Sequence, residues 1–145
     1  MKKIEIVAVG RLKEDFFVFA AEEYIKRLGR FCDVKTVELS EVGGKAKESE
    51  AILAAVKNRR FWLLDIAGEQ LDSESFAALL DKECQGGLAV FVIGGSEGVN
   101  EKVLEAAARR ISFGKFTYPH RLMRVMLLEQ VYRAMTIIEG MPYHK

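Results

Sequence analysis

Apolar and polar residues follow two different periods along the chain, and these predict strands and helices in alternation. Short, mostly apolar runs predict strands at 3–9, 34–39, 61–66, 88–93 and 111–113, and amphipathic spacing predicts helices at 14–28, 46–57, 73–83, 100–110 and about 122–139. Asp72 and Asn100 stand where they can cap the third and fourth helices. Strands that alternate with helices predict an α/β fold with a mostly parallel sheet and helices on both faces.

The chain shows no composition break, repeat or low-complexity segment, so we expect one domain over residues 1–145. A chain of 145 residues can bury a hydrophobic core without disulfides or a metal. Half of its residues are hydrophobic and only 2 are proline, which excludes the disordered and fibrous classes.

The apolar run at the start of the chain ends at Val9 and charged residues follow it, so we do not expect a signal peptide. No run approaches the roughly 20 apolar residues of a membrane span. We therefore expect a cytoplasmic protein without a membrane partner.

Cys32 and Cys84 are isolated and are interpreted as small buried hydrophobes. His120 and His144 lack a second ligand at helical spacing, so no metal site is predicted.

Charge is distributed unevenly along the chain. The formal net charge is +1, but residues 1–100 carry −3 and residues 101–145 carry +4. A polyanion would be attracted to the C-terminal part. On charge alone, an ordinary solvated surface explains the same pattern equally well.

The final predicted helix is apolar on more than one side, from Leu122 through Met126 and Val131 to Ile138. One face of a small domain cannot bury all of these residues. A second subunit that covers the remaining face, and hence a homodimer, is one interpretation, and a central helix in a monomer is the other.

Two turns carry candidate ligand contacts. The segment FVIGGSEG places Gly94 and Gly95 directly after a buried strand, where the backbone can approach a ligand closely. It matches neither the phosphate-binding P-loop nor GxGxxG, and by itself it is compatible with a plain turn. The segment SFGKFTYPHRLMR combines Gly114 with aromatic and basic residues in the next strand-to-helix connection. Its backbone could bind an adenine edge while its aromatic rings contact the face.

The C-terminal tail brings Tyr143, His144 and Lys145 close to the helix that carries Arg133. An aromatic ring, an imidazole and a cation suit an RNA base and its phosphate. A tail of this kind can also be inert.

Four segments of the chain, LLDIAGE, FVIGGSEG, ISFGKFTYPHRLMRVMLLEQVYRA and GMPYHK, together resemble the RlmH (YbeA-like) family of bacterial ribosomal methyltransferases, which are SPOUT enzymes. The resemblance implies a SPOUT fold with a C-terminal trefoil knot, a feature that periodicity alone could not predict. It further implies a homodimer that uses S-adenosylmethionine, without a metal, to methylate N3 of pseudouridine 1915 in 23S rRNA of the assembled ribosome.

The same resemblance assigns roles to individual residues. The cofactor contacts are expected at Leu64, Gly94, Gly95, Phe113, Gly114, Lys115, Phe116, Thr117 and Tyr118. Gly114 departs from the small hydroxyl residue expected there in the family. Arg133, Tyr143 and His144 are the candidate catalytic residues: Arg133 to stabilise negative charge on the base, and His144 or a nearby water to accept the proton. Lys115, Arg121, Arg124 and Lys145 are candidate phosphate contacts.

Two alternative functions remain open at this point. One is a non-catalytic protein that binds RNA or the ribosome, which would have no site for S-adenosylmethionine. The other is a methyltransferase of the same fold that acts on transfer RNA or on another rRNA position.

Overall fold

In the computed structural model, which describes residues 1–145, five strands alternate with five helices. In chain order they are β1 (Lys2–Val9), α1 (Asp15–Leu28), β2 (Cys32–Leu39), α2 (Gly44–Val56), β3 (Trp62–Gln70), α3 (Ser73–Cys84), β4 (Ala89–Ile93), α4 (Glu101–Ala106), β5 (Arg109–Ser112) and α5 (His120–Ile138). All strand pairs are parallel, and the sheet order is β2-β1-β4-β3-β5. The predicted α/β fold is confirmed.

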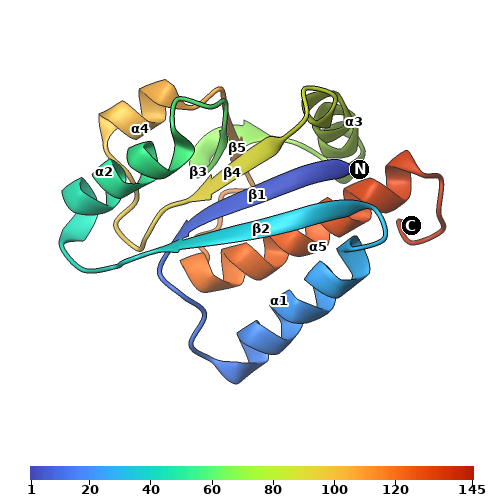
Figure 1. Ribbon diagram of the computed structural model, residues 1–145, viewed down its shortest axis with the longest axis horizontal. Helices are drawn as coiled ribbons and strands as arrows, with labels where there is room; N and C mark the ends of the chain where they lie inside the picture. Colours follow the sequence, from blue (N-terminus) through green and yellow to red (C-terminus); the bar gives the residue numbers. More distant parts are fainter.

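The sheet is covered on both faces because successive side chains of a strand point to opposite sides. Ile4 and Ile6 of β1 pack with buried residues of α1, α3 and α5, whereas Val7 and Val9 pack with buried residues of α2 and α4. Figure 1 shows α1 and α5 on one side of the sheet and α2 and α4 on the other. Because both faces of the sheet are buried in this way, the strands are continuous apolar runs in the sequence.

The two predicted helix caps are confirmed. The carboxylate of Asp72 accepts a hydrogen bond from the backbone N–H of Ser75 at 2.7 Å, and the side chain of Asn100 accepts one from Val103 at 3.2 Å. Each cap satisfies a backbone donor that the first helical turn leaves without a partner.

The prediction of a helix over 100–110 is wrong at its C-terminal end. Helix α4 ends at Ala106, Ala107 is extended, and Arg109 already belongs to β5. The backbone N–H of Ala108 donates to the carbonyl of Phe61 at 2.9 Å, so pairing with β3 overrides the helical propensity of this alanine run.

Strand β3 extends beyond the predicted end at 66 because it contains a bulge. Both Leu64 and Glu69 pair with Ile111, and the residues between them leave the ladder. A Cβ on Gly68 would lie 2.7 Å from the backbone of Arg110, so only glycine allows this close approach. Ile66, predicted to be buried, is exposed on the bulge.

Cys32 and Cys84 are buried, and burial raises the pKa of both thiols to about 11, so both stay protonated. None of the helices combines the length and the apolar composition needed to cross a bilayer. The trefoil knot stays a prediction.

Candidate functional site

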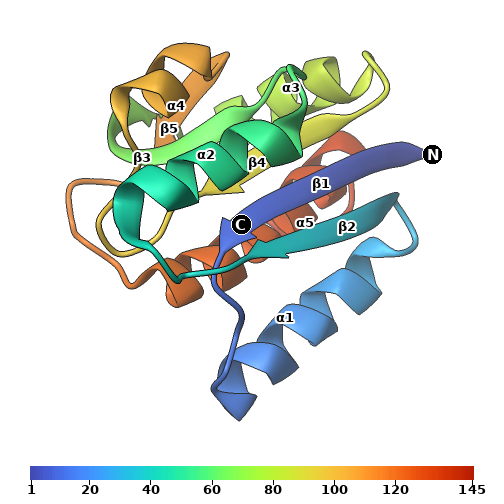
Figure 2. The same ribbon diagram turned by 60° about the vertical axis from the view of Figure 1, so that its left-hand side comes forward.

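Three turns line one cavity of about 420 Å³, which we call the turn cavity. They are 64–67 in β3, 94–99 after β4, and residues of 112–118 after β5. Because the strands are parallel, these turns meet at the same edge of the sheet, and Figure 2 shows those after β4 and β5 side by side. Such an edge is where open α/β sheets bind ligands.

The wall of the turn cavity contains eight of the nine residues that the sequence assigned to a cofactor. These are Leu64, Gly94, Gly95, Phe113, Gly114, Phe116, Thr117 and Tyr118. Lys115 is exposed and lies outside the wall. Asp65, Ile66, Glu97, Arg110 and His120 also line the cavity, and sequence reasoning had not assigned them to it.

The glycines of the second turn are required by close packing. A Cβ on Gly95 would lie 2.6 Å from a carboxylate oxygen of Glu48, and one on Gly94 would lie 2.9 Å from Val99. Gly98 has a φ of 77°, and it pairs with Gly95 in an isolated bridge. The two glycines therefore bring the backbone of this turn to the cavity, beside the side chain of Glu97.

The third turn is held by Ser112. Its hydroxyl donates to the carbonyl of Gly114 at 2.9 Å and accepts from the N–H of the same residue at 3.1 Å. Gly114 has a φ of 116°, in the region that favours glycine. The glycine found in place of a hydroxyl residue thus has a conformational role in this loop.

His120, the first residue of α5, lines the turn cavity and carries one polar atom without a partner. Its Nε2 is buried without a hydrogen-bond partner, and the nearest acid, Glu41, lies 3.9 Å away. Burial lowers the pKa of the imidazole, and the neighbouring Arg121 lowers it further. This nitrogen is covered by protein atoms and does not open onto the cavity.

The three candidate catalytic residues lie together around Glu129, and we call these four residues the tail cluster. Glu129 accepts hydrogen bonds from Arg133 at 2.7 Å and from the hydroxyl of Tyr143 at 2.8 Å. Arg133 lies 3.1 Å from Nδ1 of His144 and 4.7 Å from the centre of the Tyr143 ring. Sequence reasoning missed Glu129, although its spacing of four residues from Arg133 on a helix was a usable signal.

The ionisation of the tail cluster limits what each member can do. Burial, together with the hydrogen bond to Glu129, raises the pKa of Tyr143 to about 12. The same carboxylate raises the pKa of Arg133. Tyr143 therefore stays a neutral donor and Arg133 a cation at physiological pH, and neither can accept a proton.

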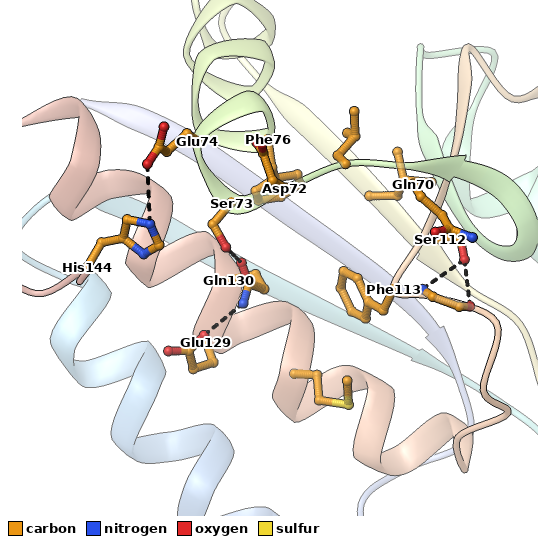
Figure 3. Close-up of a pocket in the computed structure, with 14 residues that line it drawn as sticks. Gln70, Asp72, Ser73, Glu74, Phe76, Ser112, Phe113, Glu129, Gln130 and His144 are labelled. Carbon is orange, nitrogen blue, oxygen red and sulfur yellow. Dashed lines mark hydrogen bonds and ion pairs between the residues drawn. The ribbon is translucent and has the colours of Figure 1, made fainter.

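His144 and Glu129 line a second cavity of about 650 Å³, the tail cavity. In Figure 3, His144 faces Glu74 on one side of it, and Ser112 and Phe113 lie on the opposite side. Residues 112–114 line both cavities, so the turn cavity and the tail cavity adjoin along this short segment.

The expectation that Arg124 contacts phosphates is wrong. Its side chain is 4% exposed and donates to the carbonyl of Gly10 at 2.6 Å and to Glu38. Arg121 pairs with Glu41 at 2.5 Å, which leaves Lys115 and Lys145 as the exposed cations among the predicted contacts.

No group of three or more His, Cys, Asp or Glu side chains is arranged to hold a metal ion.

Comparison with known proteins gives a consistent result over the whole chain. Residues 1–144 match a family model described as predicted SPOUT methyltransferase. The chain is 45% identical to the ribosomal RNA large subunit methyltransferase H of Limosilactobacillus reuteri strain DSM 20016, and 43% and 42% identical to the proteins of that name from Clostridium beijerinckii and Caldicellulosiruptor saccharolyticus. Each match covers 98% of this chain and 99% of the relative.

Proposed function

The chain belongs to the SPOUT methyltransferase family, and on this premise we propose that it transfers a methyl group from S-adenosylmethionine to 23S rRNA in the ribosome. The observation that carries the proposal is the meeting of three distant turns in one cavity, which shares residues 112–114 with the tail cavity that Glu129 and His144 line. The names of the relatives support ribosomal RNA of the large subunit as the substrate.

The turn cavity suits S-adenosylmethionine in size and chemistry. A volume of about 420 Å³ lies in the range of small-molecule sites. Backbone groups of the glycine turn offer hydrogen bonds, and Phe113, Phe116 and Tyr118 offer apolar surface to an adenine. Glu97 adds negative charge that favours a cationic sulfonium, whereas Asp65 is paired with Arg110 at 3.7 Å.

S-adenosylmethionine supplies an electrophilic methyl group, so the protein has to align the acceptor nitrogen and remove its proton. The methyl carbon bonds to the nitrogen, its bond to sulfur breaks, and S-adenosylhomocysteine leaves. Arg133 stabilises the negative charge that develops on the base, and Tyr143 contacts the nucleoside. His144, or water beside it, accepts the proton.

The specific acceptor that we propose is N3 of pseudouridine 1915. Its N–H is flanked by two carbonyl groups, so its loss places negative charge on oxygens that a guanidinium can bind. Arg133 lies between Glu129 and His144 and has the fixed charge that this role needs. Because ribosomes are the substrate, the proposed reaction takes place in the cytoplasm.

A homodimer is part of the proposal. Phe16 and Phe19 of α1 are 67% and 73% exposed, and Tyr132 of α5 is half-buried. Helix α1 lies beside α5, and Tyr24 and Tyr132 are in contact across them. A second copy would cover these apolar side chains. Sedimentation of the wild type as a dimer and of Phe16→Ser/Phe19→Ser as a monomer is the expected result.

Calorimetry with S-adenosylmethionine tests the proposed function against a non-catalytic RNA-binding protein. A methyltransferase binds the donor at one site per chain, and Gly95→Val, which introduces a clash with Glu48, weakens that binding. The absence of any binding heat, with the protein folded, would favour the non-catalytic alternative.

A further inference from the structure

A groove of about 650 Å³ lies at the amino ends of β3, β4 and β5, on the sheet edge opposite to the turn cavity. We call it the basic groove, because its charged residues are Arg59, Arg60, Lys82, Arg109 and one acid, Glu83. Four cations against one carboxylate give the lining a formal charge of +3, which the ion pairs of Arg59 with Glu5 and of Arg109 with Glu69, at 2.6 Å, reduce to +1.

The ion pairs within the basic groove leave part of this charge free. Arg59 holds the buried carboxylate of Glu5 at 2.7 Å and therefore has a structural role. Arg60 contacts Glu83 at 3.2 Å, but its side chain is 70% exposed. Lys82 is exposed and takes part in no ion pair, so Arg60 and Lys82 can both reach an anionic ligand.

The backbone at the rim of the groove is strained. Lys57 and Asn58 have φ values of 53° and 63°, a left-handed conformation that is uncommon for residues other than glycine. This turn leads from the end of α2 into Arg59 and Arg60 and adds the exposed Lys57 to the same edge. Strained backbone of this kind is concentrated at functional sites.

The groove also has an aromatic component. Trp62 lines it, and the guanidinium of Arg109 lies 5.6 Å from the centre of the indole ring. The indole N–H of Trp62 has no hydrogen-bond acceptor in the chain. Trp62 is itself only 2% exposed, so it positions Arg109 at the groove and does not stack on a base.

We propose that the basic groove binds the phosphate backbone of ribosomal RNA at a second contact, separate from the site of methyl transfer. This inference rests on the proposed function, which supplies the RNA. The five residues of β4 span about 17 Å, so the groove and the turn cavity contact different nucleotides of the same RNA. RNA is favoured over an acidic protein segment because the ion pair of Arg60 with Glu83 is largely exposed and therefore weak, and its planar guanidinium matches phosphate geometry.

The test compares two charge-reversed proteins. Arg60→Glu/Lys82→Glu changes the groove, and Lys45→Glu/Lys102→Glu makes the same charge change at exposed lysines in the first turns of α2 and α4. Arg60→Gln/Lys82→Gln repeats the test without repulsion from Glu83. Thermal unfolding checks that every variant is folded.

The measurements are binding to large ribosomal subunits as a function of salt, steady-state methyl transfer, and calorimetry with S-adenosylmethionine. For the groove variants we expect about tenfold or greater loss of ribosome affinity, and a salt slope lower by about 2, one for each lost phosphate contact. KM for ribosomes rises accordingly, whereas kcat and donor affinity match those of the control. Groove variants that bind ribosomes as well as the control protein overturn the proposal.

A photo-crosslinking residue at position 82 identifies the partner directly. Irradiation of the complex with large ribosomal subunits is expected to link the protein to rRNA. Linkage to a ribosomal protein alone, or no linkage, overturns the proposal. If wild-type protein transfers no methyl group to the ribosome, the proposed function fails, and the crosslink still decides whether the groove contacts RNA.

Discussion

Nη1 of Arg133 lies 3.1 Å from Nδ1 of His144. A guanidinium only donates, so Nδ1 accepts this hydrogen bond and the proton of the neutral imidazole resides on Nε2. That Nε2 lies 3.6 Å from Glu74. For His144 to accept a proton through Nδ1, Arg133 must first turn towards the substrate, which is the movement expected when negative charge develops on the base.

Replacing Arg133 tests this coupling. For Arg133→Lys we expect kcat to fall about 100- to 1000-fold, because one ammonium cannot contact Glu129, His144 and the base together. Donor affinity by calorimetry should not change, because Arg133 is not among the residues that line the turn cavity. Arg11→Lys, at an exposed position, is the matched control. Wild-type turnover in Arg133→Lys would remove this residue from the mechanism.

His144→Gln tests the proposed proton acceptor separately. Glutamine keeps a group that can accept from Arg133 but cannot take up a proton at neutral pH. We expect kcat to fall roughly 100-fold, which is the usual contribution of a general base. The fall should be smaller at high pH, where hydroxide can remove the N3 proton. An unchanged pH–rate profile would assign the proton to another acceptor.

Glu129 is predicted to act as a positioning residue. Glu129→Gln weakens the contacts to Arg133 and Tyr143, and a displacement of about 1 Å at the reacting groups can cost roughly 100-fold in kcat. Glu139→Gln, at an exposed position next to α5, is the control. Steady-state kinetics on ribosomes that give equal kcat for the two variants would contradict this role.

Gly114 and Gly87 are two comparable positions for an alanine substitution. Their φ values are 116° and 105°, and a Cβ would meet no atom within 4 Å at either position. Alanine should therefore cost about 1–2 kcal/mol of unfolding free energy at each, measured by denaturant titration. Only Gly114→Ala should weaken S-adenosylmethionine binding, because only Gly114 lines the turn cavity. Equal donor affinities would separate this loop from the donor site.

The ion pair between Glu5 and Arg59 makes the free energy of unfolding depend on pH. Arg59 lowers the pKa of the buried Glu5 carboxyl from its ordinary value of 4.5. The pair therefore stabilises the fold above about pH 4.5, and this contribution is lost as the pH falls through the lower folded-state pKa. Arg59→Met leaves a buried charge unpaired and should cost about 3–5 kcal/mol at pH 7.

Glu5→Leu/Arg59→Met is the control for that loss, because it removes both charges. It should recover most of the stability and lack the acid-dependent decrease between pH 4.5 and lower values. Denaturant titrations at several pH values that show no difference between the single and double variants would contradict this account.

Local signals in the sequence predicted the sheet and two of the three turns around the turn cavity, whereas Leu64 in the remaining turn was assigned through the family resemblance. Strand runs such as Val90–Ile93 and the glycines at 94 and 95 report burial and close packing directly. The boundary between α4 and β5 was not predictable from local signals, because the alanines before Arg109 favour a helix and only pairing with β3 makes the segment extended.

The remaining features depend on contacts between distant residues. The bulge of β3 depends on the close contact between Gly68 and the backbone of Arg110. The cations of the basic groove come from separate segments of the chain. The role of Glu129 follows from the return of the tail, which places Tyr143 against it across 14 positions of sequence. No local pattern encodes these arrangements.

Methyl transfer to ribosomes tests the central claim most directly. Ribosomes from a bacterial strain without its own copy of this enzyme are incubated with the protein and S-adenosylmethionine, and the rRNA is mapped by mass spectrometry. We predict a single methyl group on pseudouridine 1915 of 23S rRNA, at N3, and none with Arg133→Lys over the same period. A methyl group at another position, on transfer RNA, or nowhere, would contradict this account.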